Sequence, residues 1–137
     1  MRQSPVRFAI VSAVLVATMA CNNSSSTPTA PATTTETFAG TLTVNGAQTY
    51  QFTVVNAGTI TATLTTVGPD STVLIGMSLG VWSGTSCSVG TGLALDQAAQ
   101  GSVLTATVSA PGTLCLRMYD SGTLTASATY SVDVTHP

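Results

Sequence analysis

The sequence contains very little charge. Only 6% of its 137 residues are Asp, Glu, Lys or Arg, about a quarter of the usual share in globular proteins. Lysine is absent, and the three basic residues are Arg2, Arg7 and Arg117. Domains that bind nucleic acids carry clustered basic residues on one face. We therefore do not expect DNA or RNA as partners.

Residues that carry hydrolytic or metal chemistry are also scarce. The single histidine, His136, is the penultimate residue, where a frayed terminus would not position it as a base for a Ser or Cys nucleophile. Zinc sites need more His and Cys than the chain offers. Four aspartates stand singly in the C-terminal part, where we expect them to cap turns: Asp70, Asp96, Asp120 and Asp133. We expect no enzyme activity, cofactor or metal, with a calcium site built from distant aspartates as the alternative.

No apolar run is long enough to span a bilayer, which takes about 20 residues. The longest is the mostly apolar, uncharged stretch from Phe8 to Ala20, which follows Arg2 and Arg7 and ends in small residues. This order is typical of a secretory signal peptide, and a buried core helix is the alternative. We predict a signal peptide at residues 1–20.

The end of this stretch, Val16-Ala17-Thr18-Met19-Ala20-Cys21, resembles a bacterial lipoprotein signal ending at its lipobox cysteine. Ala20 fits the pattern, whereas Thr18 replaces the usual Leu, so ordinary cleavage to a secreted or periplasmic protein is the alternative. The resemblance implies that Cys21 carries a diacylglycerol and an N-acyl chain such as palmitate, which would hold the protein on a membrane. Asn22 follows in place of Asp, which implies an outer membrane, at its periplasmic or surface face.

Residues 21–37 are predicted to comprise the lipidated cysteine and a Ser/Thr/Pro-rich linker. Residues 22–36 contain no aromatic residue and no Val, Ile or Leu, and their only charge is Glu36. Such a segment cannot bury enough surface to offset its ordering entropy. We expect a disordered tether with a root-mean-square reach of roughly 20 Å.

The remaining residues, 38–137, are predicted to form one β-sandwich domain. Apolar residues alternate with polar ones, mainly Thr, as half-buried strands require, and turn residues such as Asn45-Gly46 and Pro111-Gly112 separate the runs. A helix period is absent, although residues 93–100 suit a turn of helix, a loop or a short strand. We predict an all-β, antiparallel, jelly-roll-like sandwich of about seven strands, near residues 41–44, 50–54, 60–64, 73–82, 104–108, 114–118 and 130–134.

Several segments together resemble the bacterial pre-peptidase C-terminal (PPC) domain. They are Phe38-x-Gly40-x-Leu42, Tyr50-x-Phe52-x-Val54, Ala57-Gly58-Thr59-Ile60, the stretch from Ala110 to Asp120, and Tyr130-Ser131-Val132-Asp133-Val134. The resemblance covers nearly all of residues 38–135 and implies a jelly-roll-like sandwich of an exported protein. Unlike the family's usual arrangement, we expect no peptidase before the domain. Asp70-Ser71-Thr72-Val73-Leu74-Ile75 departs from the family's Asp-x-Asp-Leu-x-Leu pattern, so a calcium or polar role there is not carried over.

Cys87 and Cys115 form an even pair once Cys21 is assigned to lipid. In an oxidising compartment we expect them to form a disulfide. Cys115 faces away from the alternating set of Leu114 and Leu116, so the bond would tie the Ser/Gly-rich segment around Cys87 to a neighbouring strand. A reactive thiol is the alternative, and it lacks a basic partner.

Trp82 is the strongest candidate for ligand binding. An exposed indole beside Gly80 and Ser83 could stack on a sugar ring, with Tyr119 as a second surface. The alternative is that Trp82 covers the second face of its strand or packs on the disulfide. We expect Arg117 to stack on Tyr119 rather than to bind an anion.

Together these features predict a non-catalytic, membrane-anchored envelope lipoprotein whose sandwich is a binding or accessory module. The alternatives are a carbohydrate-binding module with an exposed aromatic platform and a purely structural envelope protein. Its expected partners are the membrane, through the lipid, and an envelope protein or polysaccharide.

Overall fold

The computed structural model describes Thr27 and residues 29–137. The predicted signal peptide and Cys21 lie outside the described residues. Within the described part the chain forms eight strands and no helix. The strands are β1 (Thr34–Leu42), β2 (Ala47–Val54), β3 (Gly58–Gly68), β4 (Ile75–Trp82), β5 (Cys87–Ala98), β6 (Val103–Val108), β7 (Gly112–Tyr119) and β8 (Ala128–His136).

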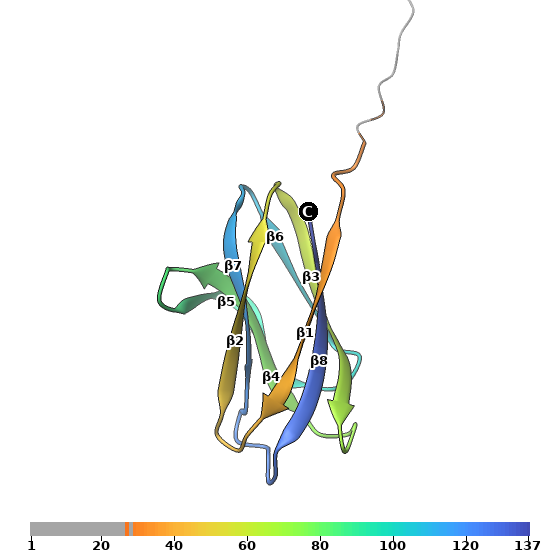
Figure 1. Cartoon of the computed structure of the whole chain (residues 1–137), viewed down its shortest axis with the longest axis vertical. Helices are drawn as coiled ribbons and strands as arrows, with labels where there is room; N and C mark the ends of the chain where they lie inside the picture. Colours follow the sequence, from red (N-terminus) through yellow and green to blue (C-terminus); the bar gives the residue numbers. More distant parts are fainter. Residues whose placement is uncertain (1–26, 28) are drawn as a thin grey trace, which may run out of the picture.

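The strands form two antiparallel sheets of four, which face each other (Figure 1). The first sheet has the order β1-β8-β3-β6, and the second has the order β2-β7-β4-β5. Eight strands divided in this way between two sheets make a jelly roll. The predicted all-β, antiparallel, jelly-roll-like sandwich is therefore confirmed.

The structure adds one strand to the seven predicted. Residues 87–98 form the edge strand β5. The sequence left helix, loop and short strand open for residues 93–100 and predicted a Ser/Gly-rich loop around Cys87. The β4–β5 register shifts twice, between Ile75 and Met77 and between Ser78 and Gly80. Bulges of this kind interrupt the alternation of side chains, so the period-two signal is lost along β5.

The first strand begins earlier than predicted. Residues 34–37, which were predicted to belong to the linker, form the start of β1, where Thr34 pairs with His136 of β8. This pairing also corrects the expected frayed terminus, because His136 ends β8 and is only 4% exposed. At the other end β1 stops at Leu42, and Val44 is exposed rather than part of the strand.

The hydrophobic core lies between the sheets and is built by the predicted alternation. On β3, for example, Ile60, Ala62 and Leu64 are buried while Thr59 is exposed. Fully burying a side chain such as Leu or Ile contributes about 1.5–3 kcal/mol. The largest fully buried apolar side chains are Leu42, Val54, Ile60, Leu64, Ile75, Met77, Leu116, Met118, Val132 and Val134.

The antiparallel order collects the connections at two ends of the sandwich (Figure 1). We call the end where β1 begins the tether end; it holds the β2–β3 and β6–β7 turns and the C-terminus. The opposite, far end holds the β1–β2, β3–β4, β5–β6 and β7–β8 loops. The β4–β5 hairpin projects sideways from the second sheet, in the half nearer to the tether end.

Candidate functional site

Of the three candidate ligand-binding residues, Trp82, Tyr119 and Arg117, the structure separates Trp82 from the other two. In the second sheet, Tyr119 pairs with Gly76 near the far end, whereas Val81, next to Trp82, pairs with Leu114 near the tether end. Trp82 and Gly76 are six residues apart on β4, which corresponds to roughly 20 Å. Trp82 and Tyr119 therefore do not form one platform.

The Tyr119 ring is held within the protein. It packs so closely on Gly76 that a Cβ atom at that glycine would overlap the ring. The Arg117 Cζ atom lies over the ring, 5.1 Å from its centroid, which confirms the predicted stacking. The Tyr119 hydroxyl donates a hydrogen bond to Asp96 Oδ1 over 2.5 Å. Burial, followed by this bond, raises the pKa of Tyr119 to about 12.

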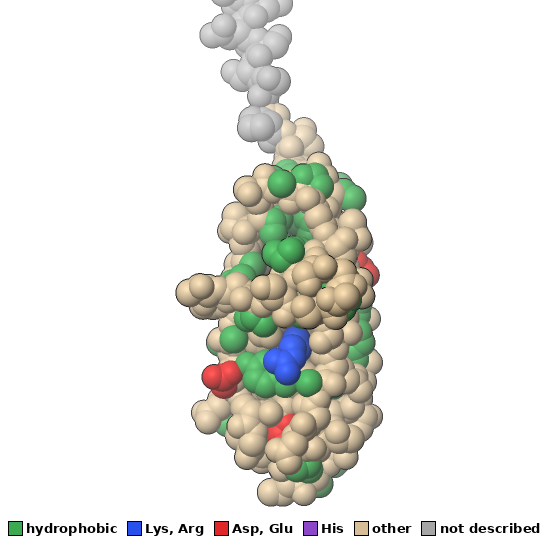
Figure 2. Space-filling model, turned by 90° about the vertical axis from the view of Figure 1, so that its left-hand side faces the viewer, with side chains coloured by type: hydrophobic (Ala, Val, Ile, Leu, Met, Phe, Trp, Pro, Cys, Tyr) green, Lys and Arg blue, Asp and Glu red, His purple; other side chains and the backbone are tan. Residues whose placement is uncertain are grey.

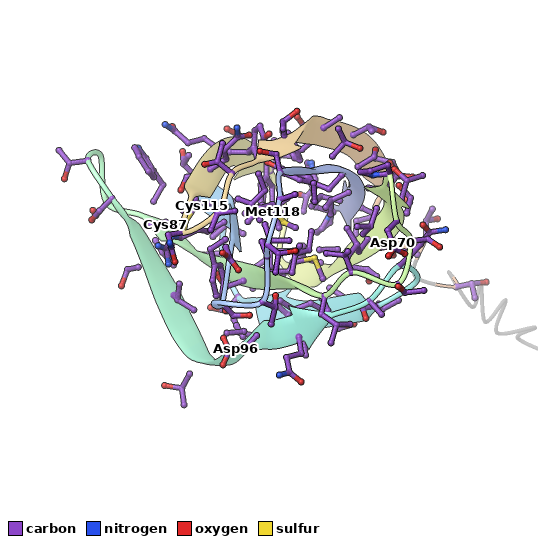
Figure 3. All side chains as sticks on the ribbon, turned by 90° about the horizontal axis from the view of Figure 1, so that it is seen from below. Asp70, Cys87, Asp96, Cys115 and Met118 are labelled. Carbon is purple, nitrogen blue, oxygen red and sulfur yellow. A yellow bond between two sulfur atoms is a disulfide. The ribbon has the colours of Figure 1, made fainter. Side chains whose placement is uncertain are left out.

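A polar basin of about 590 Å³ opens beside Tyr119 at the far end. Asp96, Asp120 and Asn45 contribute to its lining. Figure 3 labels Asp96, which lies on the edge strand β5, in a view from below. The basin therefore combines two carboxylates with an aromatic edge at the far end.

The Asp120 carboxylate is occupied as a turn cap. Oδ2 accepts the backbone N–H of Asn45, and Oδ1 accepts those of Gly122, Thr123 and Leu124. These bonds, the one from Asn45 foremost, hold the pKa of Asp120 below its usual value of 3.8. The predicted capping role is confirmed for Asp120.

The other aspartates divide between turn and strand. Asp70 Oδ1 accepts the hydroxyl and the backbone N–H of Thr72, as a turn cap does, and these bonds lower its pKa. Asp133 instead lies on β8 and accepts the Thr37 hydroxyl, and Asp96 lies on β5, so the capping prediction is wrong for these two. Among the described residues, no three His, Cys, Asp or Glu side chains come close enough to hold a metal ion.

Trp82 lines an open groove at the tether end. The groove has a volume of about 450 Å³ and runs between the end of β4 and the β6–β7 turn, which contains Pro111. Trp82 itself is half-buried. A smaller, mostly apolar cavity of about 120 Å³ adjoins the groove and reaches core residues such as Ile60. Four residues line both spaces: Val81, Thr107, Val108 and Leu114.

The predicted disulfide joins Cys87 to Cys115 in the structure, with Cα atoms 5.8 Å apart. It links the first residue of β5 to β7, across β4, and Cys115 is fully buried on the outer face of the sheet. Beside it, the backbone of Ser88 lies so close to Gly80 that a Cβ there would overlap it. The disulfide and this contact fix the base of the projecting hairpin.

The sequence did not reveal the contacts of His136, the single histidine of the chain. Its Nε2 atom lies 3.0 Å from Glu36 Oε1. Its ring packs against Phe52, with the ring centroids 5.3 Å apart and the ring planes tilted by 36°. The Nδ1 atom is buried without a hydrogen-bond partner among the described residues. His136 therefore joins the start of β1 to the end of β8, and its hydrogen-bond partner is a carboxylate rather than a nucleophile.

No protein-family model matches the chain, and no curated protein matches it significantly. Within its described part, no helix is long and apolar enough to cross a membrane.

Proposed function

We propose that this chain is an exported, lipid-anchored and non-catalytic protein of a bacterial outer membrane. In this proposal residues 1–20 direct export and Cys21 carries the lipid. The sandwich, which resembles the PPC domain, is a binding or accessory module for an envelope protein or polysaccharide. It would stand at the periplasmic or surface face of the membrane.

The Cys87–Cys115 disulfide supports this proposal best. Disulfides persist in exported proteins and are rare in the cytosol. The bond accounts for two of the three cysteines, and the third is Cys21, which directly follows the apolar stretch of residues 8–20. A cysteine at that place is the residue that lipid attachment requires.

The proposal is tested by growing cells that express the full chain with labelled palmitate. We expect the protein to take up label, the Cys21→Ala variant to lose it, and the Cys87→Ala/Cys115→Ala double variant to keep it. The double variant is the matched control, because it changes cysteines without touching the proposed lipid site. An unlabelled wild-type protein contradicts the lipid anchor.

Carbohydrate binding is the second candidate, and the position of Trp82 in a groove beside Pro111 favours it. Aromatic faces stack on the apolar faces of sugar rings. A glycan array probed with the Cys21→Ala protein tests this candidate. Binding that is lost in Trp82→Ala and kept in Tyr119→Phe would assign the groove to a sugar.

A further inference from the structure

Apolar side chains form a shoulder on the second sheet at the tether end. The tether-end shoulder consists of Val55, Val81, Trp82, Ala110 and Pro111. Val55 is 63% exposed and Val81 is 59% exposed, the two highest values among the large apolar residues. The strand register brings them to one corner, because Val54 pairs with Gly112 and Val81 with Leu114.

Charged residues are scarce in the turns near the tether-end shoulder and more frequent in the far-end loops. The β2–β3, β4–β5 and β6–β7 turns contain no charged residue. At the tether end of the described chain, Glu36 lies 3.0 Å from His136, whereas Asp70 and Asp120 lie in far-end loops. Figure 2 shows hydrophobic side chains both above the projecting hairpin, on the side of the chain that precedes β1, and below it, where the blue, basic side chain of this face lies.

The length of the chain before β1 limits how far the tether end can lie from the membrane. Twelve residues, 22–33, separate Cys21 from Thr34. Even fully extended, they span at most about 43 Å at roughly 3.6 Å per residue. The eleven residues of β3 add roughly 35 Å from the tether end to the far end. The chain therefore restricts the distance between the lipid and the tether-end shoulder more than the distance between the lipid and the far end.

We propose that the tether-end shoulder rests on the lipid surface to which Cys21 is anchored, with Trp82 at the boundary between headgroups and acyl chains. This inference depends on the lipid anchor proposed above. Indole rings favour that boundary because one part of the ring is apolar and its N–H is polar. The apolar shoulder supplies the contact and the lipid on Cys21 supplies the proximity.

The shoulder contains no lysine or arginine, so its contact with the membrane should not depend on electrostatic attraction to anionic lipids. Polybasic segments bind anionic lipid electrostatically and release it when salt is added. This surface binds through apolar burial alone. The contact should therefore be the same on zwitterionic and anionic vesicles and should persist in high salt.

Trp82 is the only tryptophan of the chain, so its fluorescence reports on this surface alone. The test uses the full-length lipidated protein, reconstituted into phosphatidylcholine vesicles with or without brominated acyl chains. We expect Trp82 emission to shift to the blue and to fall by roughly half in brominated vesicles. The same protein with Cys21→Ala should show neither change.

Two matched controls use Val44, which is 43% exposed at the far end. In a Trp82→Phe/Val44→Trp variant, the only tryptophan lies at the far end and should not be quenched. A charge placed in the shoulder by Val55→Asp should reduce the quenching of Trp82, whereas Val44→Asp should leave it unchanged. Both valines lie in turns outside the strands, so both aspartate variants keep the core.

The outcomes separate this inference from the anchor on which it depends. Flotation with the vesicles reports the anchor, and quenching reports the contact. A protein that floats with unquenched Trp82 overturns the contact and leaves the anchor intact, and a protein that does not float contradicts both. Equal quenching of tryptophan at positions 44 and 82, or glycan binding that requires Trp82, would also overturn the contact.

Discussion

The two ends of the sandwich hold their loops by different means. At the far end, the Asp120 carboxylate accepts four backbone N–H groups and Asp70 caps its own turn. At the tether end the turns are uncharged, and the Cys87–Cys115 bond and a hydrogen bond from Val55 N–H to the Pro137 carbonyl fix them. Charged caps are stable only where water or hydrogen bonds solvate them. The charged caps of the far end therefore favour contact with water, whereas the uncharged turns of the tether end cost less free energy to remove from water.

Removal of the disulfide should have the largest effect on stability. The bond closes a loop between residues 28 apart, which corresponds to about 3 to 4 kcal/mol in the chain-entropy description. We expect the Cys87→Ala/Cys115→Ala variant to lose about that much unfolding free energy in urea titrations. Cys21→Ala, the control, should unfold like the wild type. An equal midpoint for the double variant would show that the tether end does not depend on this bond.

A smaller loss is expected when a methyl group is added under the projecting hairpin. In Gly80→Ala the new Cβ meets the backbone of Ser88, which cannot move aside as a flexible side chain would. Overpacking of this kind typically costs about 1–3 kcal/mol. Gly112→Ala is the matched control, because its Cβ meets nothing within 4 Å. Thermal unfolding of the two variants measures the difference, and equal melting temperatures would contradict the packing described here.

The smallest of the three effects is the loss of stability at acidic pH that comes from Asp120 at the far end. The pKa of Asp120 is lower in the folded protein than its usual 3.8, so near that pH the unfolded chain binds more protons than the folded one. Its contribution is fully present above about pH 4 to 5 and is lost as the pH falls through the folded pKa. Asp120→Asn keeps an oxygen for the Gly122 turn and removes this titration. We expect its melting temperature to fall less than that of the wild type between pH 5 and 3, while the disulfide variant keeps the full acid dependence.

Alternation of side chains was sufficient to predict the sandwich, because most strands pack one face on the core. On β3, Ile60, Ala62 and Leu64 alternate with threonines as far as the register shift after Leu64, and on β8 apolar and polar residues alternate from Ala128 to Thr135. Both strands were predicted. The disulfide was predicted from the even pair of cysteines, and the same alternation indicated that Cys115 points away from Leu114 and Leu116.

Prediction failed where a strand has no inward-facing apolar set. The start of β1 is Thr34-Thr35-Glu36-Thr37, whose composition cannot be told from that of a tether, and only its pairing with β8 makes it a strand. In the second sheet, the bulges between β4 and the edge strand β5 interrupt the alternation of side chains, so β5 was not predicted as a strand.

The candidate site was the hardest part to predict, because it depends on distances across strands. The sequence shows that Trp82, Arg117 and Tyr119 are unusual residues, but the register alone places Trp82 at one end and Tyr119 at the other. The role of His136 depended on Glu36, 100 residues earlier. No local signal connects two residues so far apart in the chain.

The pairing of β1 with β8 also determines how the domain carries load. A pull on the tether acts at Thr34 and along the axis of β1, which is joined to β8 by nine antiparallel residue pairs from Thr34–His136 to Leu42–Ala128. The hydrogen bonds of such a ladder lie perpendicular to the strands. A partner held at the far end would therefore load them in shear, so that they must break together rather than one by one from the end.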